Sequence, residues 1–123
     1  MLSYKILVAE DDAFTAQIIS NTFDILGIEH TVVHNGEEAL KEITYDFYDL
    51  VLMDIQMHIL DGISASKRMR KLSNTTPIIA FTSCNFEEIK HELKAAGINN
   101  FLGKPSKLNQ LPFQLLKYFK QVA

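Results

Sequence analysis

The stretch Asp49-Leu50-Val51-Leu52-Met53-Asp54 decides the fold class of this chain. It is a short apolar run that ends in a carboxylate, and Gly62 follows in the next loop. Roughly four to eight apolar residues closed by a turn signal are typical of a strand that is buried on both faces. A carboxylate at the last position of such a strand leaves the core at the edge where open α/β sheets build their sites. The stretch therefore predicts an α/β protein with a functional aspartate, Asp54.

Strand and helix patterns alternate along the whole chain. We predict strands over residues 5–9, 29–33, 50–54, 77–82 and 99–102. Alternating strands and helices with short connections imply a parallel sheet that is covered on both faces and joined by right-handed crossovers. A chain of 123 residues is long enough for one hydrophobic core, so residues 1–123 are expected to form a single domain.

Capping signals mark the first four helices. The first is predicted over residues 13–26 from the helical spacing of Phe14, Ile18, Ile19, Phe23 and Leu26. Gly27 is suited to end it. The next helices are expected to start near Asn35-Gly36, near Asp61-Gly62 (ending before Asn74) and at Asn85, where Glu88 completes a capping-box pattern.

The fifth helix contains a proline that fixes its expected start. With Asn109 as N-cap, Pro112 falls in the first turn, where its missing N–H costs nothing. A stripe at helical spacing is expected to face the core: Leu108, Leu111, Leu115 and Phe119. Phe113 and Leu116 lie off this stripe. They either widen the buried arc or form an exposed patch suited to a partner or a homodimer.

Composition excludes several classes of protein. Apolar residues make up 47% of the chain and charged residues 22%, which is ordinary for a globular domain. The net charge of -3 leaves no electrostatic footprint for nucleic acid. No apolar run approaches the roughly 20 residues that a membrane span needs, and residues 1–5 do not resemble a signal peptide. With a single cysteine, Cys84, the chain is expected to be cytoplasmic.

Polar residues follow the predicted strands at one edge of the sheet. They are Glu10-Asp11-Asp12, Asp54, Thr82-Ser83 and Lys104-Pro105. Converging carboxylates repel one another, and a hard divalent cation relieves the repulsion. An all-oxygen donor set favours Mg²⁺. Lys104 and Thr82 can contact phosphoryl oxygens, so the set predicts a phosphoryl-transfer site with a carboxylate nucleophile.

These motifs identify a family. The chain resembles, over its whole length, the receiver domains of two-component response regulators, and is most similar to the receivers of hybrid histidine kinases. The residues that carry the resemblance are Ile6-Leu7-Val8-Ala9-Glu10-Asp11-Asp12, Leu52-Met53-Asp54-Ile55-Gln56-Met57, Asp61-Gly62, Pro77-Ile78-Ile79-Ala80-Phe81-Thr82 and Ala96-Gly97-Ile98-Asn99-Asn100-Phe101-Leu102-Gly103-Lys104-Pro105. The resemblance implies a flavodoxin-like (βα)5 fold with strand order 2-1-3-4-5, an order for which another receiver of this family is a known example.

The resemblance also implies the chemistry of the site. Asp54 is expected to accept a phosphoryl group from the phosphohistidine of a histidine kinase or a histidine phosphotransfer protein. Mg²⁺ is expected to be bound by Asp11, Asp12, Asp54 and the backbone carbonyl of Gln56. The domain is then a phosphoacceptor and not an enzyme, although self-catalysed phosphorylation and dephosphorylation are compatible with it.

Signal output is likewise implied by the resemblance. Thr82 and Lys104 are expected to bind the phosphoryl oxygens, and Thr82 to move together with Phe101 at the aromatic switch position. The readout face is expected to comprise the fourth helix, the fifth strand and the fifth helix. The Lys104-Pro105 bond is usually cis in the family, and the cis form costs little before proline.

Some residues depart from the family pattern. His58 stands where proline is usual, and is either a solvated loop residue or a group beside the site that titrates near neutral pH. Phe101 has no hydroxyl, so any switching by it must rely on packing. His30, His34 and His91 lack metal-ligand spacing and are expected at the surface.

Two other functions compete with this interpretation. Phosphatases of the haloacid dehalogenase type also use an aspartate after a parallel strand, but they need a second aspartate two residues on, where this chain has Gln56. A binding module that works without phosphorylation would have lost the acidic pair, Asp54 or Lys104. All of these residues are present. The phosphoacceptor function is therefore favoured.

Overall fold

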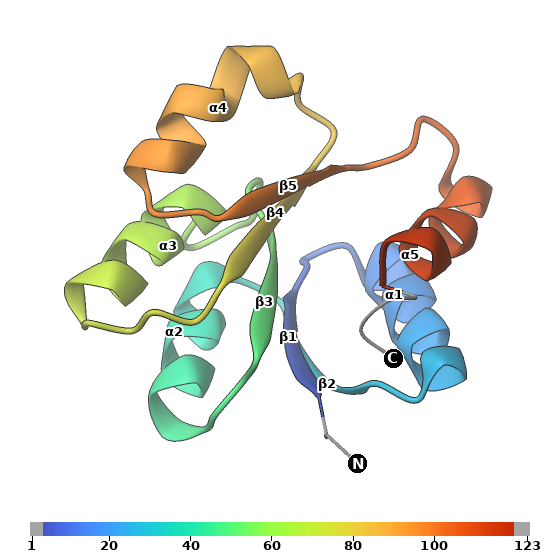
Figure 1. Cartoon of the computed structure of the whole chain (residues 1–123), viewed down its shortest axis with the longest axis horizontal. Coiled ribbons are helices and arrows are strands. Elements are labelled where there is room, and N and C mark those ends of the chain that lie inside the picture. Colours follow the sequence, from blue (N-terminus) through green and yellow to red (C-terminus); the bar gives the residue numbers. More distant parts are fainter. Residues whose placement is uncertain (1–3, 120–123) are drawn as a thin grey trace.

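Five parallel strands form the centre of the structure (Figure 1). The computed structural model describes residues 4–119, so residues 1–3 and 120–123 of the predicted domain lie outside the described part. The strands are β1 (Lys5–Ala9), β2 (Glu29–Val33), β3 (Leu50–Asp54), β4 (Ile78–Thr82) and β5 (Asn100–Gly103). Their order is β2-β1-β3-β4-β5, and every pair is parallel. The predicted flavodoxin-like topology is confirmed.

Helices cover both faces of this sheet. They are α1 (Ala13–Leu26), α2 (Gly36–Tyr45), α3 (Gly62–Lys71), α4 (Phe86–Ala95) and α5 (Leu111–Phe119), with a short 3₁₀ turn, η1 (Leu108–Gln110), before the last. Figure 1 places α1 and α5 on one face and α2 and α3 on the other. α4 lies beside β4 and β5 and buries one side chain fully, Leu93.

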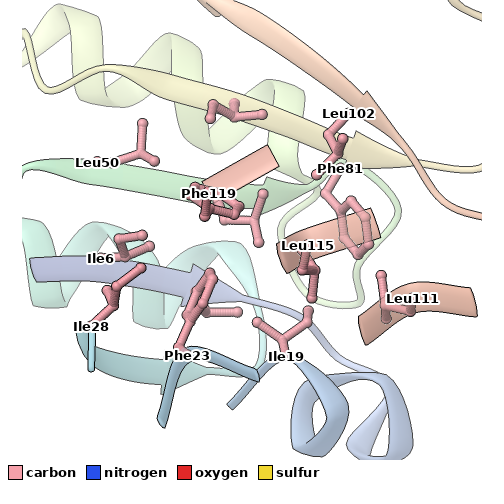
Figure 2. Packing of buried hydrophobic residues seen from close by; sticks show 13 residues of the cluster. Ile6, Ile19, Phe23, Ile28, Leu50, Phe81, Leu102, Leu111, Leu115 and Phe119 are labelled. Atoms are coloured by element: carbon pink, nitrogen blue, oxygen red, sulfur yellow. The ribbon is translucent and has the colours of Figure 1, made fainter. Parts of the chain in front are cut away.

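The core between α1, α5 and the sheet contains the buried aromatic residues Phe23, Phe81 and Phe119 (Figure 2). Phe23 of α1 and Phe119 of α5 meet edge to face, with ring centroids 5.1 Å apart. Both are buried, and each such side chain contributes about 1.5–3 kcal/mol when it leaves water. This packing fixes both helices against the strands that carry the polar residues.

β3 is buried at all five positions, which explains its unbroken apolar sequence. In the sheet register Met53 lies opposite Ala9 and Asp54 lies opposite Phe81. Thr82 pairs with Gly103 on the far side. The strands β1, β3, β4 and β5 therefore end together, at one edge of the sheet.

Several predicted boundaries need correction. The fourth and fifth strands begin one residue later than predicted, at Ile78 and Asn100, and the fifth continues to Gly103. The later start of β4 follows from Pro77, which has no N–H to donate to the hydrogen-bond ladder of the sheet. The Lys104–Pro105 peptide is trans, since every described peptide bond is trans, and the small energy difference before proline permits this.

The start of α5 also differs from the prediction. Asn109 lies inside the 3₁₀ turn and does not cap the helix, whereas Pro112 does fall in the first α-helical turn as predicted. Leu108 is 38% exposed and does not join the core stripe. Phe113 is 74% exposed, so the exposed alternative is confirmed for it, while Leu116 is half-buried.

Helix ends follow the predicted capping residues. Gly27 ends α1 with φ of 71°, a left-handed conformation that favours glycine. Asn85 caps α4, as predicted, but its side chain accepts from the backbone N–H of Glu87. The predicted capping box with Glu88 is wrong, because the N–H of Glu88 donates to the backbone carbonyl of Asn85 instead. Phe14, one of the apolar positions at helical spacing, is 71% exposed because it lies at the first turn of α1, beyond the sheet.

No helix within residues 4–119 is long and apolar enough to cross a lipid bilayer.

Candidate functional site

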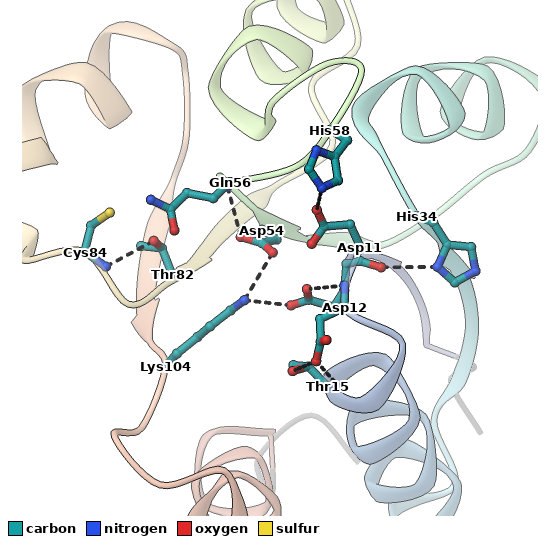
Figure 3. Close-up of polar contacts among 11 residues, drawn as sticks. Asp11, Asp12, Thr15, His34, Asp54, Gln56, His58, Thr82, Cys84 and Lys104 are labelled. Carbon is teal, nitrogen blue, oxygen red and sulfur yellow. Dashed lines mark hydrogen bonds and ion pairs between the residues drawn. The ribbon is translucent and has the colours of Figure 1, made fainter.

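Four strand ends bring the predicted polar residues into one small space (Figure 3). Glu10 follows β1, Asp54 ends β3, Thr82 ends β4 and Lys104 follows β5. These elements are far apart in sequence, and only the parallel register joins them. The structure thus confirms that these strand ends meet.

Lys104 bridges the two buried carboxylates of the site. Its Nζ lies 3.1 Å from Oδ2 of Asp54 and 2.9 Å from Oε1 of Glu10. Only 1% of Glu10 and 2% of Asp54 is exposed, and buried carboxylates are costly unless they are paired. Burial alone would lower the pKa of Lys104, but the two carboxylates outweigh it and raise that pKa. The lysine therefore carries its charge in this site.

Glu10 is the most strongly perturbed acid of the site. Burial raises its pKa to about 7, and Asp54 acts in the same direction while Lys104 opposes both. Its Oε2 accepts a hydrogen bond from the backbone N–H of Asp12 at 3.0 Å. Its Oε1 accepts no well-directed hydrogen bond among the described residues. The ion pair with Lys104, 2.9 Å away, is therefore the contact that compensates the charge on this oxygen.

Three carboxylates form a group that can hold a metal ion. One oxygen from each of Glu10, Asp11 and Asp54 lies within 4.8 Å of the other two. All donors are oxygens, the set that Mg²⁺ prefers, and within the described residues the buried Oε1 of Glu10 has no polar partner besides the ion pair with Lys104. The residues present fit a hard divalent cation.

Asp12, expected as a metal ligand, lies outside this group. Its Oδ2 accepts from the backbone N–H and the hydroxyl of Thr15, at 2.9 and 2.6 Å, and it thereby caps α1. These bonds from Thr15 lower the pKa of Asp12. Sequence reasoning therefore missed Glu10 as the acid that accompanies Asp11. The available signal was the position of Asp12 directly before a predicted helix, where aspartate is a preferred N-cap.

The backbone around Asp54 holds its carboxylate firmly. Oδ1 accepts from the backbone N–H of Gln56 at 3.0 Å. Gly62 lies so close to β3 that a Cβ there would come within 2.2 Å of the backbone oxygen of Asp54. Only glycine permits this approach of α3 to the strand end. Asp54 is thus held by the Gln56 N–H at its carboxylate and by the close packing of Gly62 at its backbone.

Thr82 and Phe101 connect the site to α4. The buried hydroxyl of Thr82 accepts from the backbone N–H of Cys84 at 3.2 Å, in the loop that leads to α4. Phe101, half-buried on β5, packs against Phe86 of α4 with ring centroids 5.0 Å apart. A groove of about 560 Å³ lies between α4 and β5, lined by both rings and by Lys90, Lys94 and Ile98.

The remaining predicted surface residues are mostly exposed. His34 and His91 are exposed, as predicted, and His58 is exposed as well. His30 is not, because its ring nitrogens lie 2.7 Å from the Ser20 hydroxyl and 2.9 Å from the Ile28 carbonyl, and its side chain is 9% exposed. Cys84 is half-buried and free.

Comparison with known proteins identifies the family. The model of the response regulator receiver domain matches residues 6–115. The chain belongs to the response regulator receiver domain family. This receiver domain is therefore a module of two-component signalling systems and not a classical enzyme.

Relatives of this receiver domain include response regulators and hybrid kinases. It is 39% identical over 103 residues to two-component response regulator 24 of Arabidopsis thaliana, covering 82% of this chain and 74% of that protein. It is 35% identical over 119 residues to hybrid signal transduction histidine kinase G of Dictyostelium discoideum. There it covers 93% of this chain but spans only 4% of the kinase.

A solved receiver structure agrees with the fold. The receiver domain of a Pseudomonas aeruginosa sensor histidine kinase is 30% identical, with a TM-score of 0.78 over 97% of this chain and 99% of that one. That structure has a magnesium ion coordinated in its active-site cleft.

Proposed function

We propose that Asp54 is the phosphoacceptor of this receiver domain. The observation that carries the proposal is the convergence of a buried carboxylate, a lysine and a buried hydroxyl at one sheet edge. In the proposed transfer, an oxygen of Asp54 attacks the phosphorus of a phosphohistidine. The P–N bond breaks as the P–O bond forms, and the imidazole leaves.

The roles of the other residues follow from charge. Lys104 Nζ, 3.1 Å from Oδ2 of Asp54, can meet the oxygens of the incoming phosphoryl group as a point charge. Thr82 can donate its hydroxyl proton to another phosphoryl oxygen. Both interactions are made only when the phosphoryl group is present, so they stabilise the phosphorylated form.

We propose that Mg²⁺ is held by Asp11, Asp54 and the backbone carbonyl of Gln56, with Glu10 in the place first expected for Asp12. When bound, the ion neutralises charge on the transferring phosphoryl group. The all-oxygen donor group and the magnesium site of the Pseudomonas aeruginosa receiver support this assignment.

The phosphodonor is proposed to be a histidine kinase or a histidine phosphotransfer protein, because hybrid histidine kinases are among the relatives. Small phosphodonors such as acetyl phosphate should also serve, since the nucleophile and its electrostatic partners lie on this chain. Residues 1–123 are proposed to act as one domain, and a cytoplasmic location remains a prediction.

Output is proposed to pass through Thr82 and Phe101 to the face formed by α4, β5 and α5. Movement of Thr82 toward the phosphoryl group would break its hydrogen bond from the Cys84 N–H and shift the loop before α4. Phe101 would follow by packing, because it contacts Phe86 of that helix. The exposed Phe113 on α5 extends this face.

Intact-mass measurement tests the proposal. The protein is incubated with acetyl phosphate in Mg²⁺ and, separately, in excess chelator. We expect a gain of one phosphoryl group in Mg²⁺ and little or none in chelator. Equal labelling in both, or no labelling from acetyl phosphate and from a phosphorylated histidine protein, would contradict it.

A further inference from the structure

His58 lies at the open side of the carboxylate group, facing Asp11 (Figure 3). Its Nε2 is 3.9 Å from Oδ2 of Asp11, and its side chain is 93% exposed. Among the described residues no other side chain pairs with the Asp11 carboxylate. His58 is not itself one of the residues whose ligand atoms lie within 4.8 Å of one another, and it approaches that group only at Asp11.

The backbone under His58 is fixed by hydrogen bonds. The N–H of Leu60 donates to the His58 carbonyl at 2.7 Å, across Ile59 with φ of 70°. The Leu60 carbonyl in turn accepts from the N–H of Gly36 at 2.9 Å, which ties this loop to the start of α2. The ring is thus carried by an anchored loop, and only its side-chain torsions are free to bring it closer to Asp11.

The ligand chemistry of imidazole differs from that of the carboxylates. Carboxylate oxygens suit Mg²⁺, whereas a neutral imidazole nitrogen suits Co²⁺, Ni²⁺ and Zn²⁺. Adjacent ligand atoms on a six-coordinate ion with bonds of about 2.1 Å are roughly 3 Å apart. The 3.9 Å between Nε2 and Oδ2 can close to that distance by a small rotation of an exposed side chain.

We propose that His58 is an additional ligand for a divalent ion held by Glu10, Asp11 and Asp54, and that it raises the affinity of this site for first-row transition-metal ions but not for Mg²⁺. The inference rests on the proposed function, because it takes these carboxylates to hold a divalent ion. Under this proposal, the preference of the site for transition-metal ions over Mg²⁺ depends on one loop residue, His58.

No other histidine of the described residues pairs with a carboxylate of this group. His30 is half-buried, and both of its ring nitrogens lie within hydrogen-bond distance of other groups. The Nδ1 of His34 lies 3.3 Å from the backbone carbonyl of Glu10 and is occupied by it. His91 belongs to α4 and lines the groove between α4 and β5. His91→Ala therefore provides a matched control in which a different exposed histidine is removed.

Calorimetric titration of wild type, His58→Ala and His91→Ala with Mg²⁺, Co²⁺ and Ni²⁺ tests the proposal, at about pH 8 where imidazole is neutral. Even outer-shell partners of metal ligands are worth about 10-fold or more in affinity. We therefore expect His58→Ala to weaken Co²⁺ and Ni²⁺ binding at least ~10-fold and Mg²⁺ binding less than about two-fold. His91→Ala should match wild type for all three ions.

Proton NMR gives an independent readout of ligation. Co²⁺ bound to the wild type should give the ring protons of His58 contact shifts, which require a metal–nitrogen bond, and not only the distance-dependent shifts of an unligated neighbour. Unchanged Co²⁺ and Ni²⁺ affinity in His58→Ala, or an equal change for all three ions, would overturn the proposal. Absence of Mg²⁺ binding by the wild type would instead contradict the proposed function, so the two failures are distinct.

Discussion

Substitution of Glu10 by glutamine isolates the charge of the most perturbed acid in the site. Glu10 is 1% exposed, and burial raises its pKa from 4.5 to about 7 in the folded protein. The folded state therefore keeps a proton over a pH range in which the unfolded chain has lost it. The stability that this proton contributes is complete below about pH 4.5, declines as the pH rises, and is gone above about pH 7. Glu10→Gln removes this dependence, because the amide does not titrate.

The size of the effect follows from the interval between the two pKa values. That interval is roughly 2.5 pH units, and each is worth about 1.4 kcal/mol. The wild type should thus lose up to about 3 kcal/mol of unfolding free energy relative to Glu10→Gln between pH 4.5 and pH 8. The pKa of about 7 already includes the opposing ion pair with Lys104, which favours the charged form.

Urea denaturation in chelator, at half-unit steps over this pH range, measures the difference. Subtracting the Glu10→Gln curve of unfolding free energy against pH from the wild-type curve removes the contribution of groups that titrate alike in both proteins. Glu92→Gln, which neutralises an exposed glutamate of α4, serves as control and should follow the wild-type curve. Parallel curves for wild type and Glu10→Gln would refute the reasoning that burial raises the pKa of Glu10 in the folded, metal-free state.

Three further substitutions test other parts of the structure. Asp12→Ala should lower the free energy of unfolding by about 1 kcal/mol through loss of the α1 cap. In thermal melts, Mg²⁺ should raise the melting temperature of this variant as much as that of the wild type. Loss of this Mg²⁺ effect would show that Asp12 is a metal ligand. Arg70→Met should lower the free energy of unfolding by about 2–4 kcal/mol in urea denaturation. The reason is that all N–H donors of the Arg70 guanidinium bond to oxygens of the loops before β4 and β5. A loss of unfolding free energy below about 1 kcal/mol would contradict this. Ile59→Asn should stabilise by about 0.5–1 kcal/mol, because Ile59 has φ of 70° and is 79% exposed, and asparagine tolerates that conformation; unchanged or lower stability would argue against strain at this residue.

The features that could be predicted from the sequence depend on periodicity and on strand direction. The apolar run of β3 identified a buried strand, and parallel strands must end at the same edge. This logic alone was enough to bring Asp54, Thr82 and Lys104 together. The exact bounds of α1 were also predicted, because Gly27 and the apolar spacing agree with each other.

Other features depend on contacts that local sequence does not encode. The family resemblance implied that Asp12 binds the metal, because sequence alone does not separate three adjacent acids; in space Asp12 caps α1, and Glu10 and Asp11 join Asp54. Phe14 fits the helical spacing of α1 but lies beyond the end of the sheet, where nothing covers it. Arg70 bonds across 27 residues to Gly97, a contact that only the completed fold creates.

The central claim is that Asp54 accepts the phosphoryl group, and peptide-level mass spectrometry after incubation with acetyl phosphate and Mg²⁺ tests it most directly. The comparison is between wild type, Asp54→Asn and Asp61→Asn, the last of which alters an exposed aspartate that caps α3. We predict one phosphoryl group on the peptide containing Asp54 in wild type and Asp61→Asn, and none in Asp54→Asn, because an amide is a poor nucleophile. Labelling of Asp54→Asn at the wild-type rate, or a label on any other residue of the wild type, would contradict the claim.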